Sequence, residues 1–347
     1  MSELNFLAYL LVFLSSSILA SILVPLLRKV AFQLDVIDRP NQKHKTHFEP
    51  VPYLGGFSIV IPTVLLSLCG GLFIEGTENY LRLLLLLMPS LIISIVGFID
   101  DSKNLPAQPR FIVQLCTSIT VSIILVETGF VSRITNYKIV DFLISIFWIV
   151  GLTNAFNFID NLDGGAAGIS FITAASIFLL GVMSGQYLIA ILSICIAGST
   201  VGFLYWNISP ARIYLGDGGA LFLGIIFSIL LLQFEPEAKS QIVSAVIPIF
   251  MVAVPIIDTT VVVTSRLRRG VPVFQGGRDH LSHRIQKLGF SRKATALILW
   301  SLSVIFSTLG LLINLLRGNV EMYIMFCGLI LMMMIFLYFL IIPSDLL

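Results

Sequence analysis

The chain of 347 residues is 57% hydrophobic and only 12% charged, and its formal net charge is +2. Soluble domains carry roughly 25% charged residues, so this chain has about half the charge that a water-exposed surface needs. The composition excludes a soluble enzyme, a disordered chain and a secreted disulfide scaffold. The class of protein that remains is a polytopic membrane protein.

Apolar runs of about 20 residues are long enough to cross the hydrocarbon core of a membrane as helices. The sequence predicts an all-α integral membrane protein with one domain over residues 1–347 and eleven spans. Ten spans would also fit, because the second, sixth and eighth runs are weaker. The runs begin near Phe6, Gly55, Leu81, Phe111, Val140, Gly165, Tyr187, Leu215, Ile242, Ala294 and Met322.

The charges that flank the runs predict the orientation of the chain. The first run has Glu3 ahead of it and Arg28 and Lys29 behind it, which is unlike a cleaved signal peptide and places the N-terminus outside. With eleven alternating spans, 16 of the 21 Lys and Arg residues fall in loops after odd-numbered spans. The sequence therefore predicts a multi-pass protein of the plasma (inner) membrane with catalytic loops in the cytoplasm.

Two adjacent carboxylates, Asp100 and Asp101, end the third run. Carboxylates at the end of an apolar helix are costly to remove from water, which indicates a functional role. On a helix they point about 100° apart, so one is expected to bind a cation or act as a base and the other to handle a proton. The alternative is an ordinary polar helix end.

Polar residues recur every third position where the fifth run ends. Asn154, Asn157 and Asp160 fall within about 120° of one helix face, and Asp163 lies further round, before two glycines. Such a stripe is unsuited to lipid and needs a polar partner. The alternative is polar contact between helices without catalytic function.

An aspartate flanked by glycines opens the eighth run, in the sequence Tyr214-Leu-Gly-Asp217-Gly-Gly219. Glycines let a phosphate approach the backbone, and a helix N-terminus favours an anion. Asp217 could hold Mg²⁺ between the protein and a diphosphate. The alternative is an aspartate that caps the helix.

The long loop after the ninth run carries eight Lys and Arg residues, Arg278 among them, together with His280 and His283. The basic residues could serve only as anchors on the cytoplasmic side. The two histidines could ligate a metal, but Mg²⁺ prefers oxygen ligands. They are therefore expected to form hydrogen bonds to a phosphate or a sugar. Lys45 and His47 in the first cytoplasmic loop form a similar group.

In their order and spacing, these motifs resemble the polyprenyl-phosphate N-acetylhexosamine-1-phosphate transferases. These membrane glycosyltransferases start peptidoglycan, O-antigen and teichoic acid synthesis. The matching segments extend over about residues 35 to 290 and are Asp38–Asn41, Lys45–His47, Pro52–Gly56, Asp100-Asp101, Asn154–Gly164, Gly216–Gly219 and His280-x-x-His283.

The resemblance implies Mg²⁺-dependent transfer, with Mn²⁺ able to substitute, of a sugar-1-phosphate from a UDP-N-acetylhexosamine to a polyprenyl (undecaprenyl) phosphate, with release of UMP. It implies Asp217 as the principal Mg²⁺ ligand and Asn157 as the second. Asp100 is implied as the base that deprotonates or orients the lipid phosphate, with Asp101 as its essential neighbour. Whether attack is direct or passes through a phospho-aspartate stays open.

The other implied roles concern the donor substrate. Asp160 and Tyr214 match the positions that hold the nucleoside, with the tyrosine ring on uracil. Taken together, the expected catalytic residues are Asp100, Asp101, Asp160, Asp163, Asp217 and Lys45. The expected substrate-binding residues are Asn154, Asn157, Asp160, Tyr214, Arg110, His47, Arg278, His280 and His283.

The sequence departs from the family pattern at several positions, and one of these departures favours one branch of the family. His44 stands where Arg is usual, Gln108 replaces a basic residue, and His280-Leu-Ser-His283 lacks a run of consecutive histidines. The last departure favours UDP-GlcNAc as donor, in lipopolysaccharide or teichoic acid synthesis, over a muramoyl-pentapeptide donor, which remains the alternative. A homodimer is compatible with the sequence, and no nucleic-acid partner is expected.

Two other classes of membrane protein share part of this pattern. Asp160-x-x-Asp163-Gly164-x-x-Ala167 matches the start of a CDP-alcohol phosphatidyltransferase signature, but Gly168 replaces the next Arg and the later aspartate pair is missing. A secondary transporter would place polar residues near the membrane midplane. Only Asp258 falls well within a run, and we expect it to have a structural or supporting role.

Overall fold

The computed structural model describes residues 3–39, 50–71, 77–103, 105–130, 135, 137–236, 240–273, 277–316 and 318–342. Lys45 and His47, two of the predicted site residues, lie outside these ranges. The described part of the chain is almost entirely helical. Its strands form one antiparallel pair of two residues each, β1 (Ile37–Asp38) and β2 (Val51–Pro52).

Nine helices in the described ranges are long and apolar enough to cross a membrane, so the prediction of an all-α polytopic membrane protein is confirmed. They are α1 (Glu3–Gln33), α3 (Thr77–Lys103), α4 (Ala107–Thr128), α5 (Lys138–Ile159), α6 (Gly165–Met183), α7 (Tyr187–Asn207), α8 (Gly216–Gln233), α12 (Arg292–Leu315) and α13 (Asn319–Ile341).

The two remaining predicted spans differ from simple long helices. The second is a short apolar helix, α2 (Phe57–Gly71), which follows the 3-10 turn η1 (Leu54–Gly56). The ninth is broken into α9 (Gln241–Met251) and α10 (Ala253–Arg268), which meet at an angle of 80°. A seven-residue helix, α11 (Leu281–Lys287), follows in the loop after α10.

Proline accounts for the break between α9 and α10. Pro255 has no N–H to give the carbonyl of Met251, and its ring clashes with a carbonyl at that position in a continuous helix. The hydroxyl of Thr173 on α6 donates to this carbonyl at 3.1 Å instead. The break therefore leaves no unpaired carbonyl at Met251.

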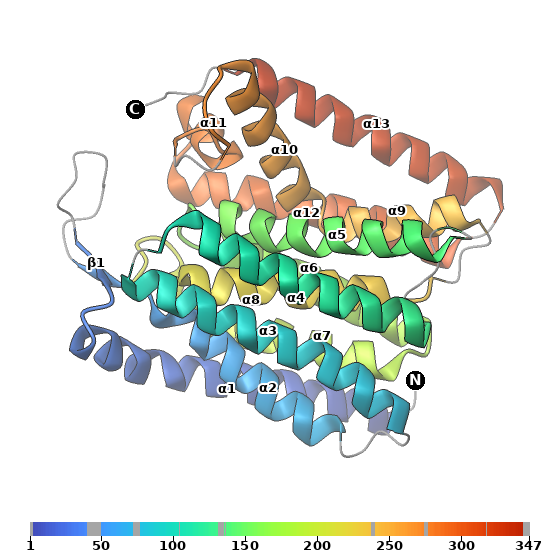
Figure 1. Ribbon diagram of the computed structural model, residues 1–347, viewed down its shortest axis with the longest axis horizontal. Coiled ribbons are helices and arrows are strands. Elements are labelled where there is room, and N and C mark those ends of the chain that lie inside the picture. The colour runs from blue at the N-terminus through green and yellow to red at the C-terminus, as the bar shows by residue number, and fades with distance from the viewer. Residues whose placement is uncertain are drawn as a thin grey trace.

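Helix α8 lies at the centre of the bundle. In its apolar window 94% of the residues are buried, against 17% in α1 and in α13. A helix that is apolar all round belongs in the interior, whereas the exposed apolar side chains of α1 and α13 suit lipid. In Figure 1, β1 and α11 lie at the same end of the bundle as the C-terminus, and the N-terminus lies at the other.

Glycines bring α7 close to α1. Gly198 and Gly202 are four residues apart on α7, and a Cβ at either position would lie within 2.4 Å of a carbonyl oxygen of α1, that of Phe13 or Ser17. Small residues at this spacing let membrane helices approach closely. The same pattern in the sequence could have identified this contact.

We expect the Gly202→Val variant to lose stability, because a Cβ there would lie 2.1 Å from the carbonyl oxygen of Ser17 and α1 would have to move. A loss of about 1–3 kcal/mol is typical of such overpacking. Thermal unfolding of the detergent-solubilised protein measures it. Gly151→Ala on α5, where a Cβ meets nothing within 4 Å, is the matched control and should keep the wild-type midpoint.

Candidate active site

The N-terminus of α8 is held by close packing against two other segments. Gly56 donates its N–H to the carbonyl of Leu215 at 2.8 Å, and a Cβ on Gly56 would lie 2.2 Å from Gly219 Cα. A Cβ on Gly97 of α3 would lie 2.5 Å from the carbonyl oxygen of Asp217. These glycines let η1, α3 and α8 meet at a single point.

The packing changes the interpretation of the glycines around Asp217. Gly216 has a φ of +73°, and a Cβ there would lie 2.5 Å from the carbonyl oxygen of Tyr53. A Cβ on Gly219 would lie 2.5 Å from Gly56 Cα. Protein atoms occupy the space where the sequence suggested that a phosphate could approach, so both glycines serve helix packing.

Asp101 caps the N-terminus of α8 from the end of α3. Its carboxylate accepts the backbone N–H of Asp217 at 3.0 Å and that of Gly218 at 3.2 Å. The first N–H groups of a helix have no partner within the helix, and a carboxylate there is also favoured by the helix dipole. Asp101 thereby fixes the position of Asp217.

Asp100 points to a different set of groups from those of its neighbour. Its carboxylate accepts the N–H of Leu105 at 2.8 Å and a hydrogen bond from Arg110. Arg110, near the start of α4, also donates to Asp217 Oδ2 at 2.5 Å. The amide of Asn157 donates to the other oxygen, Asp217 Oδ1, at 2.7 Å. Four predicted site residues from four helices therefore meet.

Asn154 faces a different helix from Asn157. Its amide donates to Gln114 Oε1 on α4 at 2.8 Å and to the carbonyl of Val150. Gln114 is buried, and its Nε2 has no hydrogen-bond partner among the described residues. The expectation that Asn154 needs a polar partner is met, but that partner is not Asp217.

Asp163 joins two loops and α12. Its carboxylate accepts the N–H of Ala211 at 3.3 Å and lies 3.4 Å from Arg292. Asn207 reinforces this junction, because it accepts the N–H of Gly164 at 2.9 Å and donates to the carbonyl of Ile213 at 2.9 Å. The contacts of Asp163 are those of a loop anchor, a role that the sequence did not indicate.

Asp160 and Tyr214 lie beside the acidic cluster. Burial, followed by repulsion from Asp217 and Asp163, raises the pKa of Asp160 to about 8, so its protonated form is favoured at neutral pH. Burial also raises the pKa of Tyr214, and negative charge on Asp163 adds to this effect. The Tyr214 ring lies 5.7 Å from that of Tyr53. A neutral phenol face at this position can take part in stacking.

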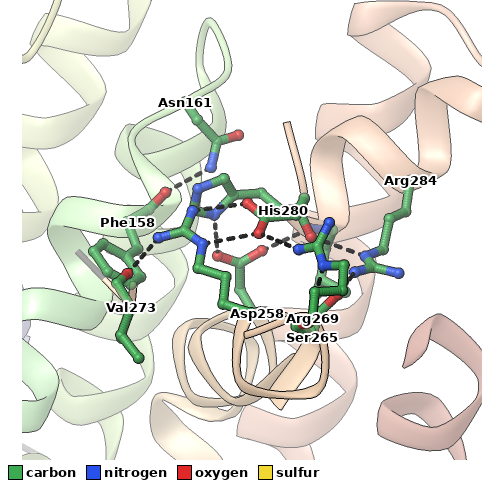
Figure 2. Close-up of polar contacts among 11 residues, drawn as sticks. Phe158, Asn161, Asp258, Ser265, Arg269, Val273, His280 and Arg284 are labelled. Atoms are coloured by element: carbon green, nitrogen blue, oxygen red, sulfur yellow. Dashed lines mark hydrogen bonds and ion pairs between the residues drawn. The ribbon is translucent and has the colours of Figure 1, made fainter. Parts of the chain in front are cut away.

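A second polar cluster surrounds His280 (Figure 2). Asp258 of α10 lies 2.8 Å from His280 Nδ1, and it also accepts the N–H of Leu281 at 2.7 Å. The His280 ring is 5.8 Å from the ring of Phe158, next to Asn157 on α5. The hydroxyl of Ser282 donates to Asn161 Oδ1. The predicted histidine motif thus packs against the end of α5.

Arginines hold the loop that carries His280. Arg266 makes two hydrogen bonds to Asp279, at 2.8 and 2.7 Å, and Arg269 adds one at 3.0 Å. Arg284 is fully buried and donates to the carbonyls of Asp279, Phe339 and Ile342. These contacts bind α11 to α10 and to the end of α13. Arg278 precedes Asp279 in this loop.

Burial lowers the pKa of His283 to about 4 from its usual 6.5, and positive charge on Arg278 adds to the effect. The folded protein therefore binds this proton less well than the unfolded chain, so stability falls as the pH drops from about 6.5 toward 4. We expect His283→Gln to weaken the dependence of the unfolding midpoint on pH between pH 7 and 5. Identical pH profiles for both proteins would contradict this.

The acidic cluster offers oxygen donors suited to Mg²⁺. Among the described residues, no group of three or more His, Cys, Asp or Glu side chains forms a complete metal site. Asp217 and Asn157 nevertheless provide a carboxylate and an amide oxygen, given that the amide can be flipped. Mg²⁺ is commonly bound by one or two carboxylates plus substrate phosphates and water. The donor set therefore fits Mg²⁺ with a phosphorylated substrate.

Sequence reasoning missed several residues that build the site. Asn207 ends an apolar helix, and Gln114 lies within another, so each was a lone polar residue in an apolar run. Such residues are costly in a membrane and usually have a partner, which is the signal that could have identified them. Arg266 is one of the eight basic residues counted after the ninth run, and nothing in the sequence pairs it with Asp279. Their pairing depends on how the loop folds.

The fold and the site define a polytopic membrane protein with a cluster of acidic and amide side chains at one end of its bundle. The pattern of glycosyl transferase family 4 matches residues 83–235. A probable undecaprenyl-phosphate N-acetylglucosaminyl 1-phosphate transferase of Bacillus subtilis is 32% identical over 332 residues, which cover 93% of this chain and 90% of the relative.

Two further relatives show lower identity. A decaprenyl-phosphate N-acetylglucosaminephosphotransferase of Mycobacterium leprae is 26% identical over 84% of this chain and 80% of its own. A phospho-N-acetylmuramoyl-pentapeptide-transferase of Staphylococcus saprophyticus is 25% identical over 89% of this chain and 99% of its own. The chain belongs to glycosyl transferase family 4, and the predicted enzyme class, a sugar-phosphate transferase, is confirmed.

Proposed function

We propose that this protein transfers N-acetylglucosamine-1-phosphate from UDP-GlcNAc to a polyprenyl phosphate such as undecaprenyl phosphate, with release of UMP. The product would be the lipid-linked sugar that starts a cell-envelope polysaccharide, such as a teichoic acid or the O-antigen of lipopolysaccharide. The observation that carries the proposal is the cluster of Asp100, Arg110, Asn157 and Asp217 at the end of four membrane helices.

The reaction joins an oxygen of the lipid phosphate to the β-phosphorus of the donor. The bond from that phosphorus to the bridging oxygen breaks, and UMP leaves with the electron pair. Asp100 accepts or holds the proton of the lipid phosphate, and Arg110 neutralises negative charge on the diphosphate. Asp217 and Asn157 hold Mg²⁺, which when bound stabilises charge on the diphosphate oxygens. Positioning supplies much of the remaining rate.

The donor substrate lies, in this proposal, between the acidic cluster and the His280 loop. Asp160 and Tyr214 bind the nucleoside, and Arg278, His280 and His283 contact the diphosphate or the sugar. Lys45 and His47 complete the phosphate contacts from the first loop. Asn154 and Asp163 support the site through Gln114 and the loops. The site faces the cytoplasm of the plasma membrane, and the enzyme acts as a monomer or a homodimer.

The second candidate is transfer of phospho-N-acetylmuramoyl-pentapeptide, since relatives with that name match most of the chain. Their identities are 25% and 27%, against 32% for the N-acetylglucosaminyl relative. The absence of consecutive histidines between His280 and His283 also favours the simpler donor. The two candidates differ in donor and share the reaction.

The direct test uses purified protein with undecaprenyl phosphate, Mg²⁺ and a panel of UDP-N-acetylhexosamines. We expect release of UMP with UDP-GlcNAc, loss of release in EDTA, and recovery with added Mg²⁺ or Mn²⁺. Release only with the pentapeptide donor would support the second candidate. Absence of UMP with every donor, or solute flux into proteoliposomes without UMP, would defeat the proposal.

A further inference from the structure

Asp258 uses both carboxylate oxygens to hold the start of the histidine motif. Its side chain is 1% exposed, Oδ1 accepts the N–H of Leu281, and Oδ2 lies 2.8 Å from His280 Nδ1 (Figure 2). An ionised carboxylate can only accept a hydrogen bond. In the contact between Asp258 Oδ2 and His280 Nδ1, the proton therefore resides on Nδ1. Nε2 is left as the nitrogen that can act on another molecule.

We propose that Asp258 is a positioning residue for His280: it fixes the orientation of the imidazole ring and the nitrogen that bears the proton, so that Nε2 meets the donor substrate. A hydrogen bond to one ring nitrogen sets the state of the other. The inference rests on the proposed function in one respect, because it takes the molecule met by Nε2 to be the sugar nucleotide.

The surroundings of His280 restrict its movement. The Phe158 ring meets the imidazole edge-on, at 84°. The hydroxyl of Ser282 is hydrogen-bonded to Asn161 in the loop after α5. Since Phe158 follows Asn157, whose amide contacts Asp217, the motif lies against the segment that also carries part of the acidic cluster. Asp258 thus orients a side chain that borders the proposed donor site.

Replacing Asp258 with Asn separates positioning from simple packing. An amide of the same shape has only one acceptor oxygen. The backbone N–H of Leu281 must keep that oxygen, so the NH₂ group then faces His280 Nδ1 and makes it an acceptor. The ring proton would move to Nε2. In serine proteases the equivalent change in an Asp–His pair preserves the geometry but fixes the wrong tautomer.

The first measurement is ¹⁵N NMR of the full-length protein labelled at histidine, of which the chain has only four. His280→Gln assigns the His280 signals by their loss. We expect a protonated Nδ1 in the wild type and an unprotonated Nδ1 with a protonated Nε2 in Asp258→Asn. An unprotonated Nδ1 in the wild type would overturn the proposal, and this spectrum decides the question even where the variant does not fold.

The second measurement is UMP release by Asp258→Asn, His280→Gln and the double variant. We expect Asp258→Asn to lower kcat by about 10- to 100-fold, with a smaller change in KM. If Asp258 acts through His280, the double variant should be no slower than His280→Gln alone. Additive losses would instead show an independent structural role for Asp258 and would contradict the proposal.

Thr259→Val is the matched control on the same helix. The Thr259 hydroxyl is buried and has no hydrogen-bond partner within the described chain, so its loss should leave both the spectrum and kcat unchanged. The experiments distinguish failure of the proposed function from failure of the positioning role of Asp258. A wild-type protein that releases no UMP defeats the proposed function, whereas the protonation of His280 is read from the NMR spectrum in either case.

Discussion

The Asp217→Asn variant should lose UMP release by about 1,000-fold or more while it remains folded. The carboxylate accepts hydrogen bonds from Arg110 and Asn157, and it is the proposed Mg²⁺ ligand. Removing one charge at a site where transition-state charge is stabilised costs several kcal/mol. The measurement is UMP release over a range of Mg²⁺ concentrations, and the residual activity should depend less on Mg²⁺ than that of the wild type.

Asp141→Asn is the matched control, because Asp141 is a buried acid in the first turn of α5, the opposite end from Asn157. Its Oδ1 accepts the N–H and the hydroxyl of Thr135, and an amide oxygen could keep both bonds. This variant should retain nearly full activity. If Asp217→Asn were as active as Asp141→Asn, Asp217 would not belong to the active site.

Asp100 and Asp101, at the end of the third span, should differ in their effects on stability and on UMP release when each is replaced by Ala. Asp101→Ala leaves the N–H groups of Asp217 and Gly218 without their acceptor. An unpaired, partly buried N–H costs about 1–3 kcal/mol, so we expect the unfolding midpoint to fall by about 5 °C. Activity should fall as well, because Asp217 loses its fixed position.

Asp100→Ala should reduce UMP release at least as strongly, with a smaller change in the unfolding midpoint. Its carboxylate faces Arg110 and the N–H of Leu105 and does not cap a central helix. Asp101→Asn, which keeps one acceptor oxygen, should fall between the wild type and Asp101→Ala in stability. The assignment of the cap would be wrong if Asp100→Ala were the less stable of the two alanine variants.

Local sequence was sufficient to predict which segments form helices in the membrane. Each of the eleven apolar runs corresponds to a helix or to the bent pair α9 and α10. The reason is physical, since the backbone in a membrane must satisfy its own hydrogen bonds and a helix of about 20 apolar residues does so alone. The short length of α2 and the break between α9 and α10 depend instead on helix packing and on the position of Pro255.

The sequence predicted which residues belong to the site. It did not predict which of them contact one another and which contact other parts of the chain. Asp100, Arg110, Asn157 and Asp217 meet, as a common function would require. Two residues nearby in the sequence with similar chemistry, Asn154 and Asp163, do not join them. Asn154 pairs with Gln114, and Asp163 anchors loops. The helical repeat gives the direction in which a side chain points around the helix axis, but it does not say which neighbouring helix lies in that direction.

By itself, the sequence determined that the chain is a polytopic membrane protein, which residues carry its acids and amides, and that their order resembles a transferase family. Only the tertiary structure decided that Asp101 caps α8, that Gly56 and Gly219 serve packing, and that Asp258 faces His280. Each of these contacts joins segments far apart in the chain. The low charge content that excludes a soluble fold therefore predicts the membrane setting, while the pairing of those few charges depends on how the helices pack.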